Sequence, residues 1–105
     1  MTLAQIESDA ENGAIAAEVK ILGIATPIWV GGKSVGPTQT LEWGDGTVIW
    51  RAGMAPSGVY TNFASGQPTP LAGSCVQMTS SGAQAGTWAN AVCSGQQAYV
   101  CQNVF

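Results

Sequence analysis

Leu41-Glu42-Trp43-Gly44-Asp45-Gly46-Thr47-Val48-Ile49-Trp50 is the stretch that decides the fold class of this chain. Leu41–Trp43 and Thr47–Trp50 are rich in the β-branched and aromatic residues that are typical of strands. Gly44-Asp45-Gly46 between them indicates a tight turn, because glycine permits the backbone angles that such turns need. The stretch therefore predicts two short strands joined by a turn.

A helix is predicted upstream of this stretch, from Asp9 to a residue between Lys20 and Leu22. Ser8-Asp9-Ala10-Glu11 has the form of a capping box, in which the Ser and Glu side chains satisfy free backbone amides at a helix start. Apolar residues then recur at helical spacing, at Ile15, Ala16, Val19 and Leu22. Gly23 supplies the stop.

Further short strands and a long loop are predicted in the rest of the chain. Ile28-Trp29-Val30 has strand character, and Gly31-Gly32 is expected to end it. Residues 52–72 are rich in Gly, Pro, Ser and Thr and predict a long loop, a type of segment that is usually functional in a compact domain. The other expected strands are Cys75–Met78, Gly86–Trp88 and Ala98–Gln102. At 105 residues the chain fits one small mixed domain.

The composition excludes several classes of partner. Charged residues make up 9% of the chain, against roughly 25% in an average domain, and residues 52–105 carry none. Duplex nucleic acid and anionic membrane surfaces both require clustered cations, which Lys20, Lys33 and Arg51 do not form. No apolar run reaches the roughly 18–20 residues of a membrane span. We therefore expect neither nucleic acid nor a membrane span.

The residue types also argue against an enzyme. The chain has no histidine, so a Ser-His-Asp or Cys-His arrangement cannot be built in the usual way. Its six acidic residues all lie in the first half, and no pattern places two of them in one rigid cleft. Glu7, Asp9 and Glu11 are close in sequence but are expected on the exposed first turns of the helix. We expect no catalytic residues.

A series of short motifs, in order along nearly the whole chain, resembles the C-type lectin domain. The motifs are Leu3–Ser8 with Glu11-Asn12, Trp29-Val30-Gly31-Gly32, Trp43-Gly44-Asp45-Gly46, Tyr60-Thr61-Asn62-Phe63 with Gly66-Gln67-Pro68, Cys75-Val76-Gln77-Met78, Trp88 followed by Cys93, and Tyr99-Val100-Cys101-Gln102. The resemblance implies an α+β, C-type-lectin-like fold, with one clear helix packed on short antiparallel strands, a long irregular loop region and a disulfide staple. Trp29, Trp43 and Trp88 are then expected to dominate the small core.

The resemblance also implies how the cysteines are used. It pairs Cys75 with Cys93, and closing a loop of about 19 residues is worth roughly 3 kcal/mol in the chain-entropy picture. The family counterpart of Cys101 bonds to a cysteine just upstream of Leu3. Residues 1–105 are thus expected to be a single domain without the family's extreme N-terminal strand and cysteine. Cys101 is a free buried thiol, an intermolecular bridge, or a cysteine separated from its partner by truncation.

Members of this family that bind sugars do so through a calcium ion held in the long loop. The matching positions here are Gln67 beside Pro68, Thr69, a position near Gly73, and Ala89-Asn90. Calcium takes six to eight oxygen ligands, several of them carboxylates, whereas Gln67 and Asn90 would each offer one neutral carbonyl oxygen. We therefore expect that the calcium site is lost and that the protein has no cofactor.

Neutral polar groups beside aromatic rings remain as candidate ligand-binding residues. They are Gln67, Thr69, Asn90, Asn62, Tyr60 and Trp50. Such a surface suits a sugar ring and a protein interface equally well. The alternative is that Tyr60 and Phe63 are core residues that pin the loop, which we favour for Phe63, while the role of Trp50 stays open.

Two functions follow from these expectations. The first is a non-catalytic, secreted recognition module that binds a protein partner or assembles with itself without calcium. Self-association is favoured because the net charge of −3 is carried entirely by the first half, which leaves the other half with little self-repulsion. The second is a carbohydrate-binding lectin with a calcium-independent or degenerate sugar site. The extracellular assignment rests on the expected disulfide and on the resemblance.

Overall fold

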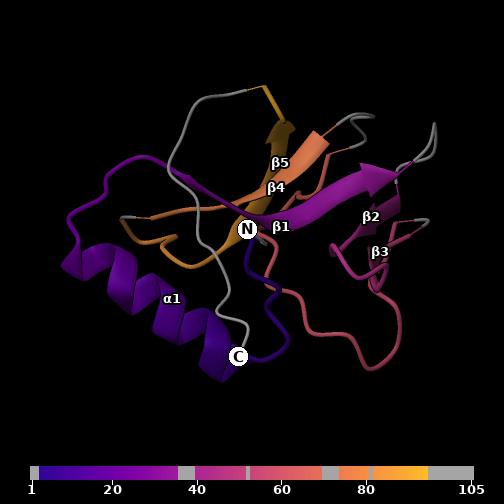
Figure 1. The fold of residues 1–105 in the computed structure, drawn as a ribbon, viewed down its shortest axis with the longest axis horizontal. Coiled ribbons are helices and arrows are strands. Elements are labelled where there is room, and N and C mark those ends of the chain that lie inside the picture. The colour runs from indigo at the N-terminus through magenta and orange to yellow at the C-terminus, as the bar shows by residue number, and fades with distance from the viewer. Residues whose placement is uncertain (1–2, 36–39, 52, 70–73, 81, 95–105) are drawn as a thin grey trace.

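The described residues form one α-helix and five short strands (Figure 1). The computed structural model describes residues 3–35, 40–51, 53–69, 74–80 and 82–94. The elements are α1 (Asp9–Ile21), β1 (Ile28–Val35), β2 (Thr40–Glu42), β3 (Val48–Trp50), β4 (Ser74–Met78) and β5 (Trp88–Val92). The strands make a single sheet in the order β3-β2-β1-β4-β5, and each neighbouring pair is antiparallel. The predicted α+β fold class is confirmed.

Helix α1 begins and ends where its local sequence predicts. The Ser8 side chain accepts a hydrogen bond from the Glu11 backbone amide at 3.1 Å, as expected of a capping box. Gly23 follows the helix with φ of 70°, and its amide donates to the Lys20 carbonyl at 3.1 Å. This arrangement satisfies a carbonyl at the helix end and requires a residue that tolerates positive φ.

The prediction that Gly31-Gly32 ends the first strand is wrong, because β1 runs through both glycines to Val35. The Gly31 amide donates to the Ala4 carbonyl at 2.8 Å, so the N-terminal segment lies against the strand here. A Cβ atom on Gly32 would lie 2.6 Å from Cγ2 of Val76 on the adjacent β4. The glycines allow close approach inside the sheet rather than a turn.

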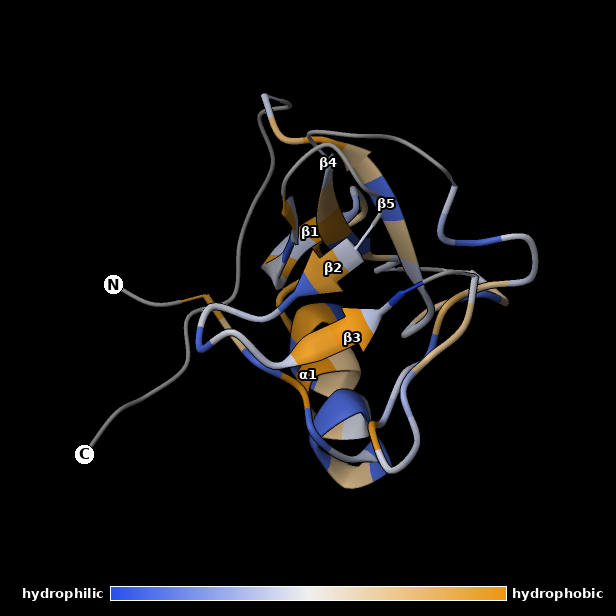
Figure 2. Ribbon diagram, turned by 90° about the vertical axis from the view of Figure 1, so that its right-hand side faces the viewer, coloured by the Kyte–Doolittle hydropathy of each residue, from blue (hydrophilic) through white to orange (hydrophobic). Residues whose placement is uncertain are grey.

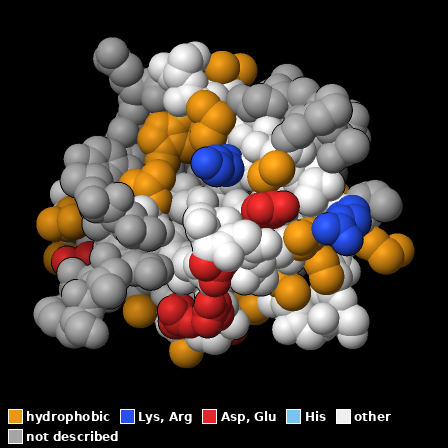
Figure 3. Space-filling model, turned by 45° about the vertical axis from the view of Figure 1, so that its right-hand side comes forward, with side chains coloured by type: hydrophobic (Ala, Val, Ile, Leu, Met, Phe, Trp, Pro, Cys, Tyr) orange, Lys and Arg blue, Asp and Glu red, His pale blue; other side chains and the backbone are white. Residues whose placement is uncertain are grey.

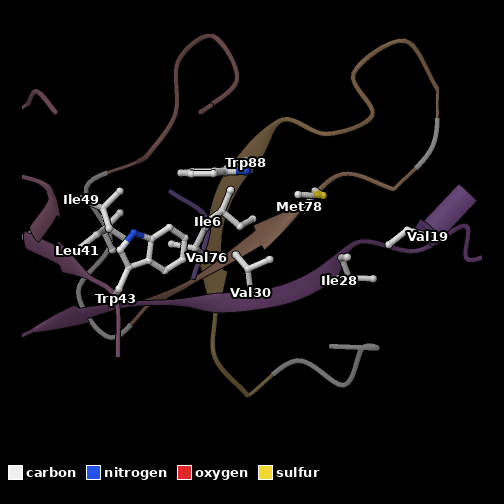
Figure 4. Packing of buried hydrophobic residues seen from close by; sticks show 10 residues of the cluster. All are labelled: Ile6, Val19, Ile28, Val30, Leu41, Trp43, Ile49, Val76, Met78 and Trp88. Atoms are coloured by element: carbon white, nitrogen blue, oxygen red, sulfur yellow. The ribbon is translucent and has the colours of Figure 1, made fainter. Parts of the chain in front are cut away.

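Ten buried residues form the hydrophobic core, between the sheet, α1 and the N-terminal segment (Figure 4). The rings of Trp43 and Trp88 meet edge to face, with centroids 5.6 Å apart. Both tryptophans are almost fully buried, as the resemblance implies. Figure 2 shows that the strongly hydrophobic residues are concentrated in the strands, whereas the connecting loops are largely polar. The core consists of Ile6, Val19, Ile28, Val30, Leu41, Trp43, Ile49, Val76, Met78 and Trp88.

Trp29 is not a core residue, contrary to expectation. Side chains alternate between the two faces of a strand, and Ile28 and Val30 take the core face of β1. Trp29 is therefore placed on the opposite face, where it is half-buried. There it lines a hollow of about 180 Å³ together with Cys75 and Cys93.

The strand–turn–strand prediction for residues 41–50 is confirmed, with β2 beginning one residue earlier than predicted and β3 one residue shorter. The Trp43 amide donates to the Thr47 carbonyl at 2.9 Å, so these two residues close the turn between β2 and β3. The Thr47 amide also donates to the Asp45 carboxylate at 2.9 Å. Asp45 is thus a turn residue, as its position between two glycines predicts.

Strand β5 begins at Trp88, so the predicted strand Gly86–Trp88 is wrong. Gly86 has φ of 90° and belongs to the preceding turn, because this backbone conformation does not continue a strand. The disulfide between Cys75 and Cys93, with Cα atoms 5.0 Å apart, joins β4 to the residue that follows β5. The predicted strand Ala98–Gln102, with Cys101, lies outside the described residues.

Residues 53–69 form the predicted long loop, which contains no helix or named strand. The loop returns to the sheet along the outer edge of β5. The Trp88 amide donates to the Asn62 carbonyl, and the Ala64 amide donates to the Trp88 carbonyl, both at 2.9 Å. The loop is therefore held by backbone hydrogen bonds at the place where the candidate site begins. In the described part of the chain, no helix has the length and hydrophobicity needed to cross a membrane.

Candidate functional site

Asn90 on β5 holds the end of the long loop through its side-chain amide. Its Oδ1 accepts hydrogen bonds from the Thr69 backbone amide at 2.7 Å and from the Thr69 hydroxyl at 2.9 Å. Its Nδ2 donates to the Thr69 carbonyl at 2.8 Å and to the Ser74 hydroxyl at 3.1 Å. An Asn side chain has two donors and two acceptor sites, so all four are engaged within the protein.

Gln67 lies beside this pair. Its Oε1 accepts a hydrogen bond from the Asn90 backbone amide at 3.4 Å, which is long and therefore weak. The Gln67 backbone amide donates to the Ala64 carbonyl at 2.9 Å, and the peptide bond between Gln67 and Pro68 is cis. The structure thus brings together three of the predicted site residues, Gln67 and Thr69 from the loop and Asn90 from β5.

Asn62 has a structural contact of its own near the start of β5. Its Nδ2 donates to the Gly86 carbonyl at 2.7 Å. Its backbone carbonyl accepts a hydrogen bond from the Trp88 backbone amide. Asn62 therefore joins the loop to the turn before β5, and its amide nitrogen already has a partner within the protein.

Tyr60 faces the beginning of α1 rather than the loop end. Its hydroxyl donates to the Asp9 carboxylate at 3.1 Å, and its ring packs edge-on against Trp88 with centroids 5.7 Å apart. Burial, and then the hydrogen bond to Asp9, raise the pKa of the Tyr60 hydroxyl above its usual value. Tyr60 links the loop to the helix.

Trp50 ends β3 and is half-buried. Its ring meets that of Phe63 edge-on, with centroids 5.5 Å apart, and Phe63 meets Trp88 in the same way at 5.4 Å. Phe63 therefore packs against the core, as favoured from the sequence, and Trp50 packs against both Phe63 and the core. Of the six candidate residues, three form one close group and three make separate contacts. The group is Gln67, Thr69 and Asn90, and the separate residues are Asn62, Tyr60 and Trp50.

Two polar residues with central roles were not recognised in the sequence. Ser74 is buried, its hydroxyl accepts a hydrogen bond from the Asn90 side-chain amide, and its backbone amide donates to the Ser34 hydroxyl. Asn12 belongs to α1 and is also buried. A signal for Asn12 was present, because it lies one helical repeat of seven residues before Val19 and so falls on the same buried stripe.

The donor set at the loop does not fit a calcium ion of the family type. Both acceptor sites of Asn90 Oδ1 are occupied by Thr69, and Gln67 Oε1 is directed at a backbone amide. Ala89 has no side-chain oxygen, and the position near Gly73 lies outside the described residues. Across residues 3–35, 40–51, 53–69, 74–80 and 82–94, no three His, Cys, Asp or Glu side chains are grouped as metal ligands. Calcium needs several carboxylate oxygens that this group lacks.

Comparison with known proteins identifies the family. The model of the family described as "Lectin C-type domain" matches residues 2–103. No curated protein sequence matches the chain. Among solved structures, the crystal structure of CEL-IV is similar with a TM-score of 0.64 and 21% sequence identity, which shows a shared fold. That match covers 86% of this chain and 56% of CEL-IV, so the chain spans little more than half the length of that relative. Because the family model covers nearly the whole chain, the protein belongs to the C-type lectin domain family.

Proposed function

We propose that this protein is a non-catalytic, extracellular recognition module that binds a protein partner, or further copies of itself, without calcium. The family is generally non-enzymatic and typically extracellular, which supports the first part of the proposal. The disulfide between Cys75 and Cys93 supports secretion, because such bonds persist in oxidising compartments.

The observation that carries the proposal is the closed hydrogen-bond pattern of Asn90. Its amide is bonded on both sides, to Thr69 and to Ser74. A metal or a sugar hydroxyl would have to break these bonds before it could use the same atoms. The Asn90 side chain therefore holds the end of the loop in place, and the rest of the loop surface is available for contacts with a protein partner.

Self-association has support from exposed apolar side chains on a weakly charged molecule. Within the part of the chain that the structure describes, the exposed large hydrophobic residues are Ile21, Leu22, Val35, Met54 and Val92. The last two lie in the half of the sequence that has no charged residue. Analytical ultracentrifugation over a concentration series tests this branch. Growth in mass with concentration supports it, and a monodisperse monomer at high concentration leaves only the hetero-partner.

Thermal unfolding with calcium, and then with a chelator, tests calcium independence. A site saturated about 100-fold above its dissociation constant adds roughly 2.7 kcal/mol, which shifts the melting temperature by about 10 °C in a domain of this size. We expect the two melting curves to coincide. A calcium-dependent shift of that size would refute the proposal.

The second candidate function is a sugar-binding lectin with a calcium-independent site. It is supported by the half-buried ring of Trp50, which meets the ring of Phe63 from the long loop. An aromatic face beside neutral donors suits a sugar ring. Binding on a glycan array that survives chelation and is lost in Trp50→Ala would favour this function over the first. Absence of glycan binding would favour the protein partner.

A further inference from the structure

The disulfide between Cys75 and Cys93 lies on the face of the sheet opposite the hydrophobic core. Ser74 and Val76, on either side of Cys75 in β4, are buried, so Cys75 faces the other way. Cys75 is half-buried, whereas Cys93, in the turn after β5, is exposed. Exposed disulfides are reduced more readily than buried structural ones. The Cys93 side of this bond can therefore be reached by a thiol from solvent.

A positively charged side chain lies beside Cys75 on the same face. Lys33 of β1 is directly opposite Cys75 in the β1–β4 register, and the Cβ atoms of opposite residues are about 4.5–5.5 Å apart. On its other side Lys33 is opposite Glu42 of β2. In Figure 3 a basic side chain near the centre of the view has hydrophobic side chains on one side and an acidic side chain on the other. A cation beside Cys75 stabilises the thiolate that forms when the disulfide opens.

The two cysteines line the hollow that also contains Trp29. Its volume is about 180 Å³, and Lys33 is another of its lining residues. Pockets that hold whole small molecules have volumes of roughly 300–1,000 Å³. The hollow is therefore too small for a complete ligand, but it gives room beside the disulfide for a small reactive group such as a thiol.

The disulfide closes one end of the hairpin formed by β4 and β5. The paired residues run from Met78 and Trp88, next to the connecting turn, to Ser74 and Val92 at the far end. Strand ends separate more easily than strand centres, because fewer contacts hold them. Cys93 directly follows β5, so its bond to β4 keeps this end of the hairpin together.

The end of the long loop is attached to the same part of the hairpin. Asn90, two residues before Val92, bonds to Thr69 of the loop through both its side-chain oxygen and its side-chain nitrogen. The same nitrogen donates to the Ser74 hydroxyl, next to Cys75. Separation of the strand ends would therefore weaken the contacts that hold Thr69.

We propose that the disulfide between Cys75 and Cys93 is a thiol-exchange site, attacked at Cys93 and assisted by Lys33, whose opening loosens the end of the long loop. A thiol loses its proton to solvent, and the thiolate attacks Sγ of Cys93. The bond between the two cysteine sulfurs breaks, and its electron pair leaves with Sγ of Cys75. The products are a mixed disulfide on Cys93 and a thiolate on Cys75 beside Lys33. This proposal rests on the proposed function only in that the loop is taken as the recognition surface.

Peptide mapping after incubation of the native protein with excess glutathione tests where the attack occurs. The reaction is stopped with acid, and free thiols are blocked with N-ethylmaleimide. Chymotrypsin cleaves after Trp88 and Tyr99, which places the three cysteines on separate peptides. We expect glutathione on Cys93 and the blocking group on Cys75. Glutathione on Cys75, glutathione on Cys101 alone, or no adduct at all would overturn the proposal.

A parallel sample without glutathione distinguishes the source of the thiol. Cys101 is not part of this disulfide, so a second copy of the chain also carries a cysteine that can attack. A dimer linked from Cys93 to Cys101 in this sample supports attack at Cys93 with the thiol supplied by another copy. A protein that stays monomeric here and reacts only with glutathione supports a small thiol.

Variants test the role of Lys33. Lys33→Gln removes the charge beside the leaving sulfur and is expected to slow the exchange by about threefold, as for other exposed charge contacts. Lys20→Gln changes the net charge equally but lies in the last turn of α1, so the rate should not change. Equal rates in all three proteins, or equal slowing in both variants, would overturn the assignment of Lys33. The wild-type rate should not rise in dilute urea, because a reaction that requires global unfolding would accelerate there.

Hydrogen exchange measures the effect on the loop. In the glutathione adduct the Thr69 amide should exchange about threefold faster or more. The Trp43 amide, which is bonded to Thr47 in the turn between β2 and β3, is the internal control and should not change. The double variant Cys75→Ser, Cys93→Ser should reproduce the acceleration, which separates the loss of the bond from the attachment of glutathione. Unchanged exchange at Thr69 in both samples would overturn loop control, and coincident melting curves with calcium and chelator would still leave the proposed function standing.

Discussion

The indole nitrogen of Trp88 donates a 2.7 Å hydrogen bond to the side-chain oxygen of Asn12, a residue 76 positions earlier in the chain. The amide nitrogen of Asn12 donates to the Gly86 carbonyl at 3.0 Å, and that carbonyl also accepts from Asn62 at 2.7 Å. One buried polar bridge thus joins α1, β5 and the long loop. It satisfies the indole N–H of a residue that is otherwise enclosed by hydrophobic groups.

Asn12→Leu is expected to destabilise the protein by about 1–3 kcal/mol, because it leaves the buried Trp88 N–H without a partner. The free energy of unfolding in urea measures the loss. Glu18→Leu, at an exposed position of the same helix, is the control and should change stability by less than about 0.5 kcal/mol. Similar losses in the two variants would show that the bridge has no special role.

Gly32→Ala is expected to cost about 1–3 kcal/mol through overpacking. The new Cβ would lie 2.6 Å from Cγ2 of Val76 and 3.0 Å from Cδ1 of Ile49. Gly44→Ala is the matched control, since nothing lies within 4 Å of its Cβ position. Combining Gly32→Ala with Val76→Ala should cost less than the two single losses added together, as a double-mutant cycle measures. Strict additivity would contradict the proposed clash.

Asn90→Ala is expected to release the end of the long loop. It removes the hydrogen-bond partners of the Thr69 backbone N–H and C=O. The free energy of unfolding should fall by about 1 kcal/mol, because Thr69 is exposed and water replaces part of these hydrogen bonds. Hydrogen exchange at the Thr69 amide should accelerate about fivefold or more, whereas Val92→Ala, at an exposed position on the same strand, should not change it. Unchanged exchange in Asn90→Ala would mean that the loop is held by other contacts.

Stability is expected to fall in alkaline solution because of Tyr60. Burial and Asp9 raise the pKa of its hydroxyl in the folded state above the usual 10.0. A raised folded pKa contributes stability below the unfolded pKa, and this contribution is lost as pH rises from about 10 through the folded value. Urea unfolding across this range should show the decline in the wild type and a smaller one in Tyr60→Phe. Parallel curves for the two proteins would contradict this assignment.

The helix and the first hairpin were predictable because their determinants are local. Ser8 and Glu11 cap α1 with contacts three residues apart, and Gly23 ends it with a bond to Lys20. Asp45 bonds to an amide two residues away. Interactions of such short range depend on neighbours in the sequence, so the sequence contains the information needed to place them.

The errors at β1 have a different cause. Gly31-Gly32 has the form of a strand end, yet these residues continue β1 because Ala4 and Val76 approach the backbone there. Trp29 is large and apolar, yet the alternation of β1 gives the core positions to Ile28 and Val30. Ala4 and Val76 come from distant parts of the chain, so the local sequence around Gly31-Gly32 does not reveal that they approach it.

The amino-acid order by itself determined the helix, the turn at Asp45, the weak charge of the second half and the resemblance that pairs Cys75 with Cys93. Only the tertiary structure decided that the Asn90 amide is fully bonded to Thr69 and Ser74, and that Lys33 lies opposite Cys75. The physical reason is distance along the chain. Caps and turns form between neighbours, whereas these groups are 16 residues or more apart and meet only when the whole sheet, helix and loop have folded together.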